Sequence, residues 1–318
     1  MTGRLRLAIT VSAAGIVGRA ESIAAHGLDV DRYAQIARRA EAAALDAVFL
    51  PDSPAHEPTT LLAALAAVTD RIGLIGTLSA AHNDPLELAR RVADTDYLSS
   101  GRIGWRVAEN ELAGRLYGTG PESFPDRSAF VDSVLRRWHD RTELRSPQGH
   151  PVVVRGSGDA DVVLVDGRGI HDHRQGLREA LRAQGRDPDS VVVLQNIAVV
   201  LSATDAEAEE IAPALDDLDT GGHAVVAGTP IRVADELEER LRQGRADGFN
   251  VLPDVLPSGF DAFTEHLLPE LRRRGLFRTG YESRTLRGHL GLAIPAGADS
   301  PQVRTASLTA RSRRPVTA

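Results

Sequence analysis

The sequence of 318 residues contains no cysteine. This absence excludes disulfides, thiolate metal sites and cysteine nucleophiles. Lysine is also absent, so all 37 basic residues are arginines, and because Ala and Gly are frequent as well, we ascribe them to a GC-rich coding bias. No apolar run approaches the ~18 residues of a membrane-spanning helix, and residues 1–7 lack the apolar core of a signal peptide. We therefore expect a cytoplasmic protein without membrane association.

Basic residues are also fewer than acidic residues. The 44 acidic and 37 basic residues give a net charge of −7. Nucleic-acid binding needs a basic face, so we expect no nucleic-acid partner. The hydrophobic fraction of 42% and the charged fraction of 25% are ordinary for a folded soluble protein. The length fits a single α/β barrel and does not require two domains.

Short apolar runs alternate with amphipathic segments along most of the chain. This rhythm predicts parallel βαβ units, and about eight strand candidates favour a closed TIM-type (β/α)8 barrel over an open sheet. We expect strands near residues 5–11, 47–50, 72–79, 102–107, 151–155, 161–165, 190–201 and 248–252. We expect helices near residues 29–44, 58–68, 85–98, 175–184, 204 onward, 231–243 and 260–274.

The domain organisation that follows is simple. Residues 1–295 are expected to form one barrel domain. Residues 296–318 are rich in Ser, Thr and Arg, and we expect them to form a disordered tail. The His residues show no metal-ligand spacing, so no metal site is expected.

Two long, ordered blocks of sequence resemble one known family. The first runs from TDRIGLIGT at 69–77 to LSSGRIGW at 98–105, and the second runs from GTP at 228–230 through DGFN at 247–250 to TLRGHLGL at 285–292. Both are similar to the nitrilotriacetate/dibenzothiophene-sulfone monooxygenase branch of the luciferase-like flavin-dependent monooxygenases. The resemblance covers most of residues 5–110 and 190–295.

The resemblance implies a fold, a cofactor and a reaction. Members of this family are TIM barrels that bind reduced flavin mononucleotide (FMN) at the carboxyl ends of the strands. A separate reductase supplies the flavin, and O2 then oxygenates a small organic substrate. The resemblance also implies a homodimer. The chain is shorter than its relatives, so we expect a luciferase-like barrel with reduced insertions. The sequence does not identify the substrate.

Four residues match flavin-contact positions of the family: Asp52, Thr77, Ser79 and Asn83. Asp52 equally fits a turn or a helix cap after its strand. For Thr77, a hydroxyl beside the flavin ring is favoured over a backbone hydrogen bond within the strand. His82, which stands where the family has an aromatic residue, is a weak candidate for a proton donor, and a polar loop residue is the favoured interpretation.

His56 has the same status as His82, as a weak catalytic candidate. Ser157 is the candidate for the flavin phosphate, because the family has a Ser- and Gly-rich turn here whose backbone N–H groups bind phosphate. In this chain the helix after that turn is missing, and Asp159 and Asp161 would repel a phosphate.

Other positions depart from the family pattern. Phe124 and Ser128 stand where the family has His and Tyr, and residues 106–110 replace a polar stretch that begins with Asn. These departures leave open an alternative, a catalytically degenerate homologue that acts as a binding or partner subunit. An oxidoreductase that uses a deazaflavin is a third hypothesis, which the two blocks favour least.

Overall fold

A computed structural model describes residues 5–11, 29–52, 57–80, 83–108, 127–140, 145–156, 160–167, 171–208, 210, 223–253 and 256–295. His56, His82, Ser157 and the predicted tail at 296–318 lie outside these ranges. None of the helices in the described ranges is long and apolar enough to cross a membrane.

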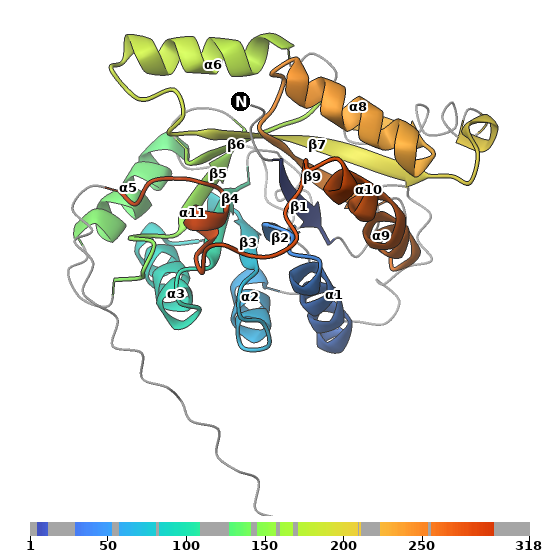
Figure 1. Ribbon diagram of the computed structural model, residues 1–318. Helices are drawn as coiled ribbons and strands as arrows, with labels where there is room; N and C mark the ends of the chain where they lie inside the picture. The colour runs from blue at the N-terminus through green and yellow to red at the C-terminus, as the bar shows by residue number, and fades with distance from the viewer. Residues whose placement is uncertain are drawn as a thin grey trace, which may run out of the picture.

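Eight parallel strands form a closed ring (Figure 1). Around the ring the order is β1-β2-β3-β4-β5-β6-β7-β9, and the pairing of β9 with β1 closes it. Their bounds are β1 Arg6–Thr10, β2 Ala47–Leu50, β3 Gly73–Leu78, β4 Ile103–Val107, β5 Val152–Arg155, β6 Val162–Val165, β7 Val192–Leu201 and β9 Gly248–Pro253. The predicted TIM-type barrel is confirmed, and each ring strand falls at a predicted position.

The helices surround the ring on its outside, except α11 (Leu286–His289), which covers the amino end of the ring (Figure 1). They are α1 Val30–Ala42, α2 Pro58–Ala66, α3 Pro85–Leu98, α5 Arg127–Asp140, α6 His171–Ala183, α8 Pro230–Arg242, α9 Ser258–Ala262, η4 Phe263–Leu267, α10 Leu268–Arg273 and α11 Leu286–His289. Capping residues and prolines mark where α3 and α8 begin. The side chains of Asp84 and Thr229 accept backbone N–H groups of the first turn, and a proline follows each of these two residues.

One strand of the sheet was not predicted. β8, Ala224–Gly228, pairs with the second half of β7, whereas β6 pairs with the first half. β9 overlaps both partners along β7, so β6 and β8 lie end to end on the opposite edge. Residues of β8 alternate between buried and partly exposed positions, unlike the fully buried runs of β2 and β6, so the hydrophobic pattern alone did not reveal it.

The last predicted helix is less regular than expected. Residues 258–273 form two short α-helices separated by the π-helical turn η4. Pro269 lies just after this turn, and it has no N–H to donate to the carbonyl four residues earlier. A single α-helix over 260–274 was therefore wrong in its middle.

The amino end of the barrel is closed by the segment around α11. Leu286, Leu290 and Leu292 belong to the apolar cluster inside the ring, together with Phe49 and Ile75. Two glycines make room for this plug. A Cβ on Gly73 would clash with Leu286 Cδ1, and one on Gly104 would lie 3.2 Å from Leu286 Cδ2.

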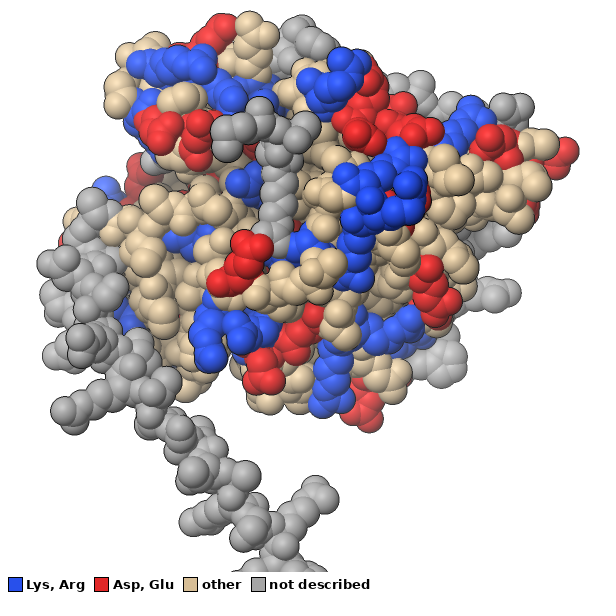
Figure 2. All heavy atoms as spheres, in the orientation of Figure 1, with Lys and Arg blue, Asp and Glu red and all other residues tan. Residues whose placement is uncertain are grey.

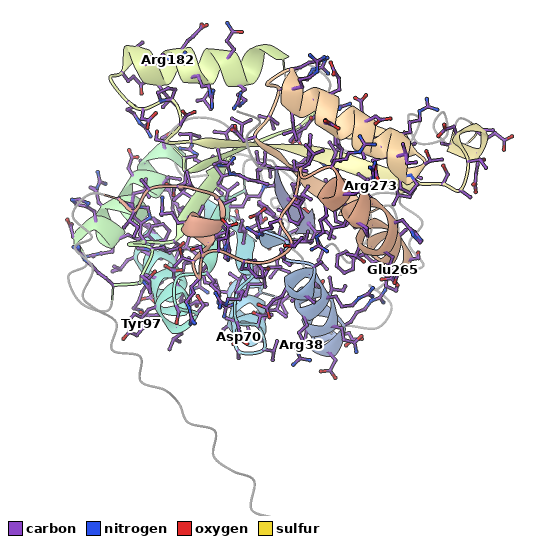
Figure 3. All side chains as sticks on the ribbon, viewed as in Figure 1. Arg38, Asp70, Tyr97, Arg182, Glu265 and Arg273 are labelled. Carbon is purple, nitrogen blue, oxygen red and sulfur yellow. The ribbon has the colours of Figure 1, made fainter. Side chains whose placement is uncertain are left out.

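The outer faces of the helices are charged. Arg38, Arg182 and Glu265 point away from the barrel in Figure 3. Acidic and basic side chains are interspersed over the face that Figure 2 shows, without a large region of one sign. Arg90, for example, contacts Glu87 at 2.8 Å, and both side chains are more than half exposed. Such exposed pairs add little stability.

Candidate functional site

The inside of the barrel is divided into an apolar and a polar half. Side chains alternate along each strand, so residues two apart face the same side. Toward the amino end the lumen contains Ala8, Phe49, Ile75 and other apolar side chains. Toward the carboxyl end, the same alternation places buried polar side chains in the lumen: Thr10, Thr77, Asn196 and Asn250. Functional sites of TIM barrels lie at this carboxyl end.

Thr77 lies on the lumen side of β3, two residues after Ile75. Its side chain is only 7% exposed. Its Oγ1 has no hydrogen-bond partner among the residues that the structure describes. A buried hydroxyl without a partner costs about 1–3 kcal/mol, so such groups normally have a ligand or water beside them. The alternative interpretation, a hydrogen bond from Thr77 to the backbone, is not found within the described ranges.

Three of the other predicted flavin contacts, Asp52, Ser79 and Asn83, lie at the same end of the barrel as Thr77. Asp52 follows β2 and Ser79 follows the neighbouring β3, so both lie at the carboxyl end of the ring. Asn83 holds the loop before α3: its Nδ2 donates to Ser79 O at 2.8 Å, and its Oδ1 accepts from Arg91. Thus Asp52, Thr77 and Ser79 share one mouth of the ring, as predicted from the sequence. Whether any of them contacts a flavin stays a prediction.

Arg106 adds a positive charge to this mouth. It lies on β4 two residues after Gly104, the glycine that faces the lumen, and its register partner on β3 is Thr77. From the sequence alone, this position is notable only because it lacks the family's Asn.

A chain of polar side chains runs from β1 to the end of β6. Asn250 Nδ2 donates to Thr10 Oγ1 and to Asn196 Oδ1, each at 2.7 Å. Asn196 Nδ2 donates to Asp166 Oδ1 at 2.5 Å. His223 Nδ1 lies 2.8 Å from the same Asp166 oxygen.

The charge of Asp166 is stabilised by these neighbours. Burial by itself would raise the pKa of this carboxyl group. The adjacent imidazole of His223, the hydrogen bond from Asn196 and the positive charge of Arg106 outweigh burial and lower the pKa below its ordinary value. Asp166 is therefore a carboxylate at neutral pH.

Sequence analysis missed Arg106, Asp166, Asn196, His223 and Asn250, although a signal was present for the three that lie within strands. Each of these three interrupts a buried strand: IGWRV, VVLQNIAVVL and GFNVLP. A polar side chain within an otherwise apolar barrel strand lies in the lumen or among the helices, and either place calls for a partner. His223 and Asp166 sit outside strand cores, so only their contacts in space reveal them.

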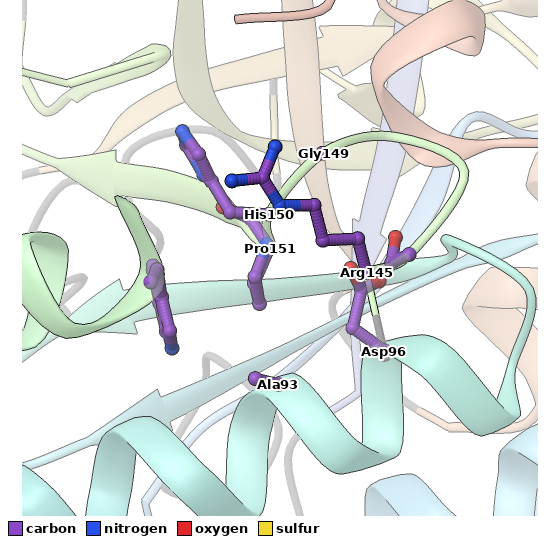
Figure 4. A pocket seen from close by; sticks show the side chains of 8 residues that line it. Ala93, Asp96, Arg145, Gly149, His150 and Pro151 are labelled. Carbon is purple, nitrogen blue, oxygen red and sulfur yellow. The ribbon is translucent and has the colours of Figure 1, made fainter. Parts of the chain in front are cut away.

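The opposite end of the barrel holds a small pocket (Figure 4). Ala93 and Asp96 of α3 face Arg145, His150 and other residues of the segment before β5. Asp96 is fully buried and accepts hydrogen bonds from Ile103 N at 3.0 Å and Gln148 Nε2 at 2.7 Å. Burial raises its pKa to about 6.

This pocket is part of a structural network. Gln148 Oε1 accepts from Arg287 N at 3.0 Å, and Arg287 forms a two-pronged ion pair with Asp161 at 2.6 and 2.9 Å. The network fastens the α11 plug to β4, β5 and β6. Features at the amino end of a TIM barrel serve stability rather than catalysis.

Comparisons with known proteins agree with the geometry. The sequence profile described as "Luciferase-like monooxygenase" matches residues 12–150. Nitrilotriacetate monooxygenase component A from Aminobacter aminovorans is 27% identical, over 84% of this chain and 91% of the relative. That alignment spans 414 positions, more than the 318 residues of this chain, so the relative has long segments without a counterpart here.

Two further similarities cover most of the chain. The solved structure of EDTA monooxygenase from Chelativorans sp. BNC1 matches with a TM-score of 0.77 at 23% identity, over 92% of this chain and 99% of the other. This likeness shows the shared fold. One of the subunits of pristinamycin IIA synthase from Streptomyces pristinaespiralis is 30% identical, over 68% of this chain and 90% of the relative. The chain therefore belongs to the luciferase-like monooxygenase family.

Proposed function

We propose that this protein is an oxygenase that takes reduced FMN from a separate reductase and oxygenates a small organic substrate. The relatives support a two-component system: one is named "component A" of a monooxygenase, and two others are different subunits of the same synthase. Of the structural neighbours, one is a monooxygenase in complex with FMN and another contains a modified FMN.

The observation that carries the proposal is the unpaired hydroxyl of Thr77. Oγ1 is buried in the lumen at a family flavin position, and no described residue satisfies it. The polar edge of an isoalloxazine ring offers both donors and acceptors, and a hydroxyl can pair with either. A bound flavin would remove the cost of this unsatisfied group.

The residues at the mouth fit a reduced flavin. Thr77 would face the polar edge of the ring, and Asp52 and Ser79 lie at the same mouth. Arg106 would favour the electron-rich reduced form, because a positive charge in a low-dielectric site stabilises negative charge. When bound, the reduced flavin supplies the two electrons that the reaction of O2 with substrate requires. The protein orients the reactants and excludes water.

An anaerobic titration tests the proposal. Reduced FMN is added to the protein and binding is followed by calorimetry, with Thr77→Val as the variant and Thr264→Val, on the outer helices, as the matched control. We expect micromolar or tighter binding for the wild type and the control, and about tenfold weaker binding for Thr77→Val. No binding by the wild type would reject the proposal.

One observation favours a second candidate, a partner subunit without its own activity. Residues 156–161 alone join β5 to β6, and of these the described residues 156, 160 and 161 are not helical. The family has its phosphate-binding turn and helix here. If the protein stabilises or activates an active relative on mixing and fails to bind reduced FMN, the second candidate replaces the first.

We also propose that the protein forms a homodimer. The resemblance places the interface on helices of the N-terminal half, and α3 exposes apolar side chains there. Leu98 is 78% exposed, and Leu86 and Tyr97 are 46% and 43% exposed. Analytical ultracentrifugation of the wild type and Leu98→Asp measures the oligomeric state, and a monomeric wild type would exclude the dimer.

A further inference from the structure

The edge of β7 changes its partner in the middle of the strand. Val165, the last residue of β6, pairs with Gln195, and Ala224, the first of β8, pairs with Ile197. Asp166 follows β6 and His223 precedes β8. Both residues therefore meet beside Asn196, at the one position of β7 between its two partners.

The negative charge of Asp166 determines which atoms of Asn196 and Asn250 donate and which accept in this network of hydrogen bonds. A carboxylate only accepts, so Asn196 must present its Nδ2 to Asp166. Asn196 Oδ1 then accepts, so Asn250 must present its Nδ2 in turn. The orientation of both amides follows from this network.

This network of hydrogen bonds ends at Asn250 Oδ1, an acceptor that receives no hydrogen bond from the described residues. Asn250 Nδ2 gives its two hydrogens to Asn196 and Thr10, which leaves Oδ1 as the remaining polar atom of the side chain. Asn250 is 1% exposed, and its Oδ1 has no hydrogen-bond partner among the described residues. A buried acceptor of this kind calls for an N–H or O–H donor from a ligand.

The imidazole of His223 is oriented by the same carboxylate. At 2.8 Å from Asp166 Oδ1, Nδ1 carries the proton, because the carboxylate has none to give. In this tautomer the lone pair of the ring lies on Nε2, which can accept a proton from a ligand. The positive charge of Arg106 also acts on Asp166.

We propose that the junction of β6 and β8 on β7 is a substrate subsite, which binds a small ligand with a weakly acidic O–H or N–H group through Asn250 Oδ1 and the His223–Asp166 pair. The subsite concerns the substrate of the proposed oxygenase and in that respect rests on that function. Its proton step is balanced: the ligand's proton passes to Nε2, the imidazolium is stabilised by Asp166, and the proton returns to the product or to solvent. The pair is unchanged after turnover.

If the His223–Asp166 pair had only a structural role, the buried asparagines next to it would have no explanation. Asp166 is 46% exposed, and an exposed pair needs no buried amide chain behind it. The two buried asparagines and their unused acceptor fit a ligand site. The structural and ligand-binding interpretations differ in two measurable properties, the tautomer of His223 and the preference of the site for donors.

The first measurement is NMR spectroscopy of the full chain with 15N-labelled histidine. His223→Gln identifies the resonances of His223. We expect the Nδ1–H tautomer in the wild type and in Asp189→Ala, an exposed control, and a shift of the population toward Nε2–H in Asp166→Ala. If Asp166→Ala leaves the tautomer unchanged, Asp166 does not orient the ring and the proposal is wrong.

The second measurement compares two probes, phenol and anisole, which share an aromatic ring and differ in the O–H donor. We expect phenol to bind the wild type about tenfold more tightly than anisole, with shifts of the His223 and Asn250 side-chain signals. The preference should fall in His223→Phe and disappear in the double variant His223→Phe/Asn250→Leu, which lacks both acceptors. Equal binding of both probes to the wild type, or a preference that the double variant retains, would overturn the subsite.

Reduced FMN is titrated into the same samples to separate the two proposals. If reduced FMN does not bind but the donor preference and the tautomer shift are found, the oxygenase proposal fails and the subsite stands. If reduced FMN binds and neither effect is found, the subsite fails and the oxygenase proposal stands.

Discussion

Asp96 makes the stability of the barrel depend on pH in a direction opposite to that of most carboxylates. It is fully buried on α3. Oδ1 accepts two hydrogen bonds, whereas Oδ2 has no hydrogen-bond partner within the described ranges. Burial raises its pKa from 3.8 to about 6, so the folded protein favours the protonated form. This contribution to stability is complete below pH 3.8, and it is lost as the pH rises through about 6.

The magnitude follows from the size of the shift. A shift of about two pKa units corresponds to about 3 kcal/mol of folding free energy between the two protonation states. Asp96→Asn keeps the Oδ1 acceptor for Ile103 and Gln148 and stays neutral throughout. The stability of this variant relative to wild type should therefore rise by about 2.4 kcal/mol from pH 4 to pH 7.5, because the contribution is not yet complete at pH 4.

Urea unfolding at the two pH values measures this difference. Asp132→Asn, an exposed change on α5, controls for the loss of one negative charge. A relative stability of Asp96→Asn that stays constant with pH, or falls toward pH 7.5, would refute the argument from burial.

Three further changes test other parts of the structure. Gly104→Ala would place a Cβ 2.8 Å from Ile75 Cγ1 inside the packed lumen, so it should lower the free energy of unfolding by about 1–3 kcal/mol in urea titrations; an unchanged midpoint would contradict the packing. Arg287→Met would leave the Asp161 carboxylate buried without its ion pair, at a cost of about 3–5 kcal/mol, measured as a loss of thermal stability that restoring Arg at this position reverses. Thr77→Val removes a hydroxyl without a described partner, so the free protein should be as stable as wild type or up to about 1 kcal/mol more stable, and a clear destabilisation would reveal a hydrogen bond in the free protein.

The barrel could be predicted from sequence because its strands are buried on both sides. Runs such as Val192–Leu201 are almost wholly apolar, and helices of 9–14 residues separate many of them. β8 escaped prediction because its residues are only partly buried and it pairs on one edge only. The break at η4 depends on how Pro269 is accommodated, which the helical periodicity of its neighbours does not encode.

The site could be predicted only in part. Asp52, Thr77 and Ser79 were found because strand ends and the family resemblance point to the same mouth. The chain from Asp166 to Asn250 was not found, because its members lie on four strands or strand ends that are distant in sequence. Which residues meet there depends on the partner change along β7, which is a property of the sheet and not of any one segment.

The central claim is that the polar carboxyl end of the lumen holds the flavin ring beside Thr77. A crystal structure of the protein prepared anaerobically with reduced FMN tests it most directly. The account predicts isoalloxazine density in the lumen with a polar ring atom within hydrogen-bond distance of Thr77 Oγ1. Flavin density elsewhere on the protein, or side chains that fill this mouth, would contradict it.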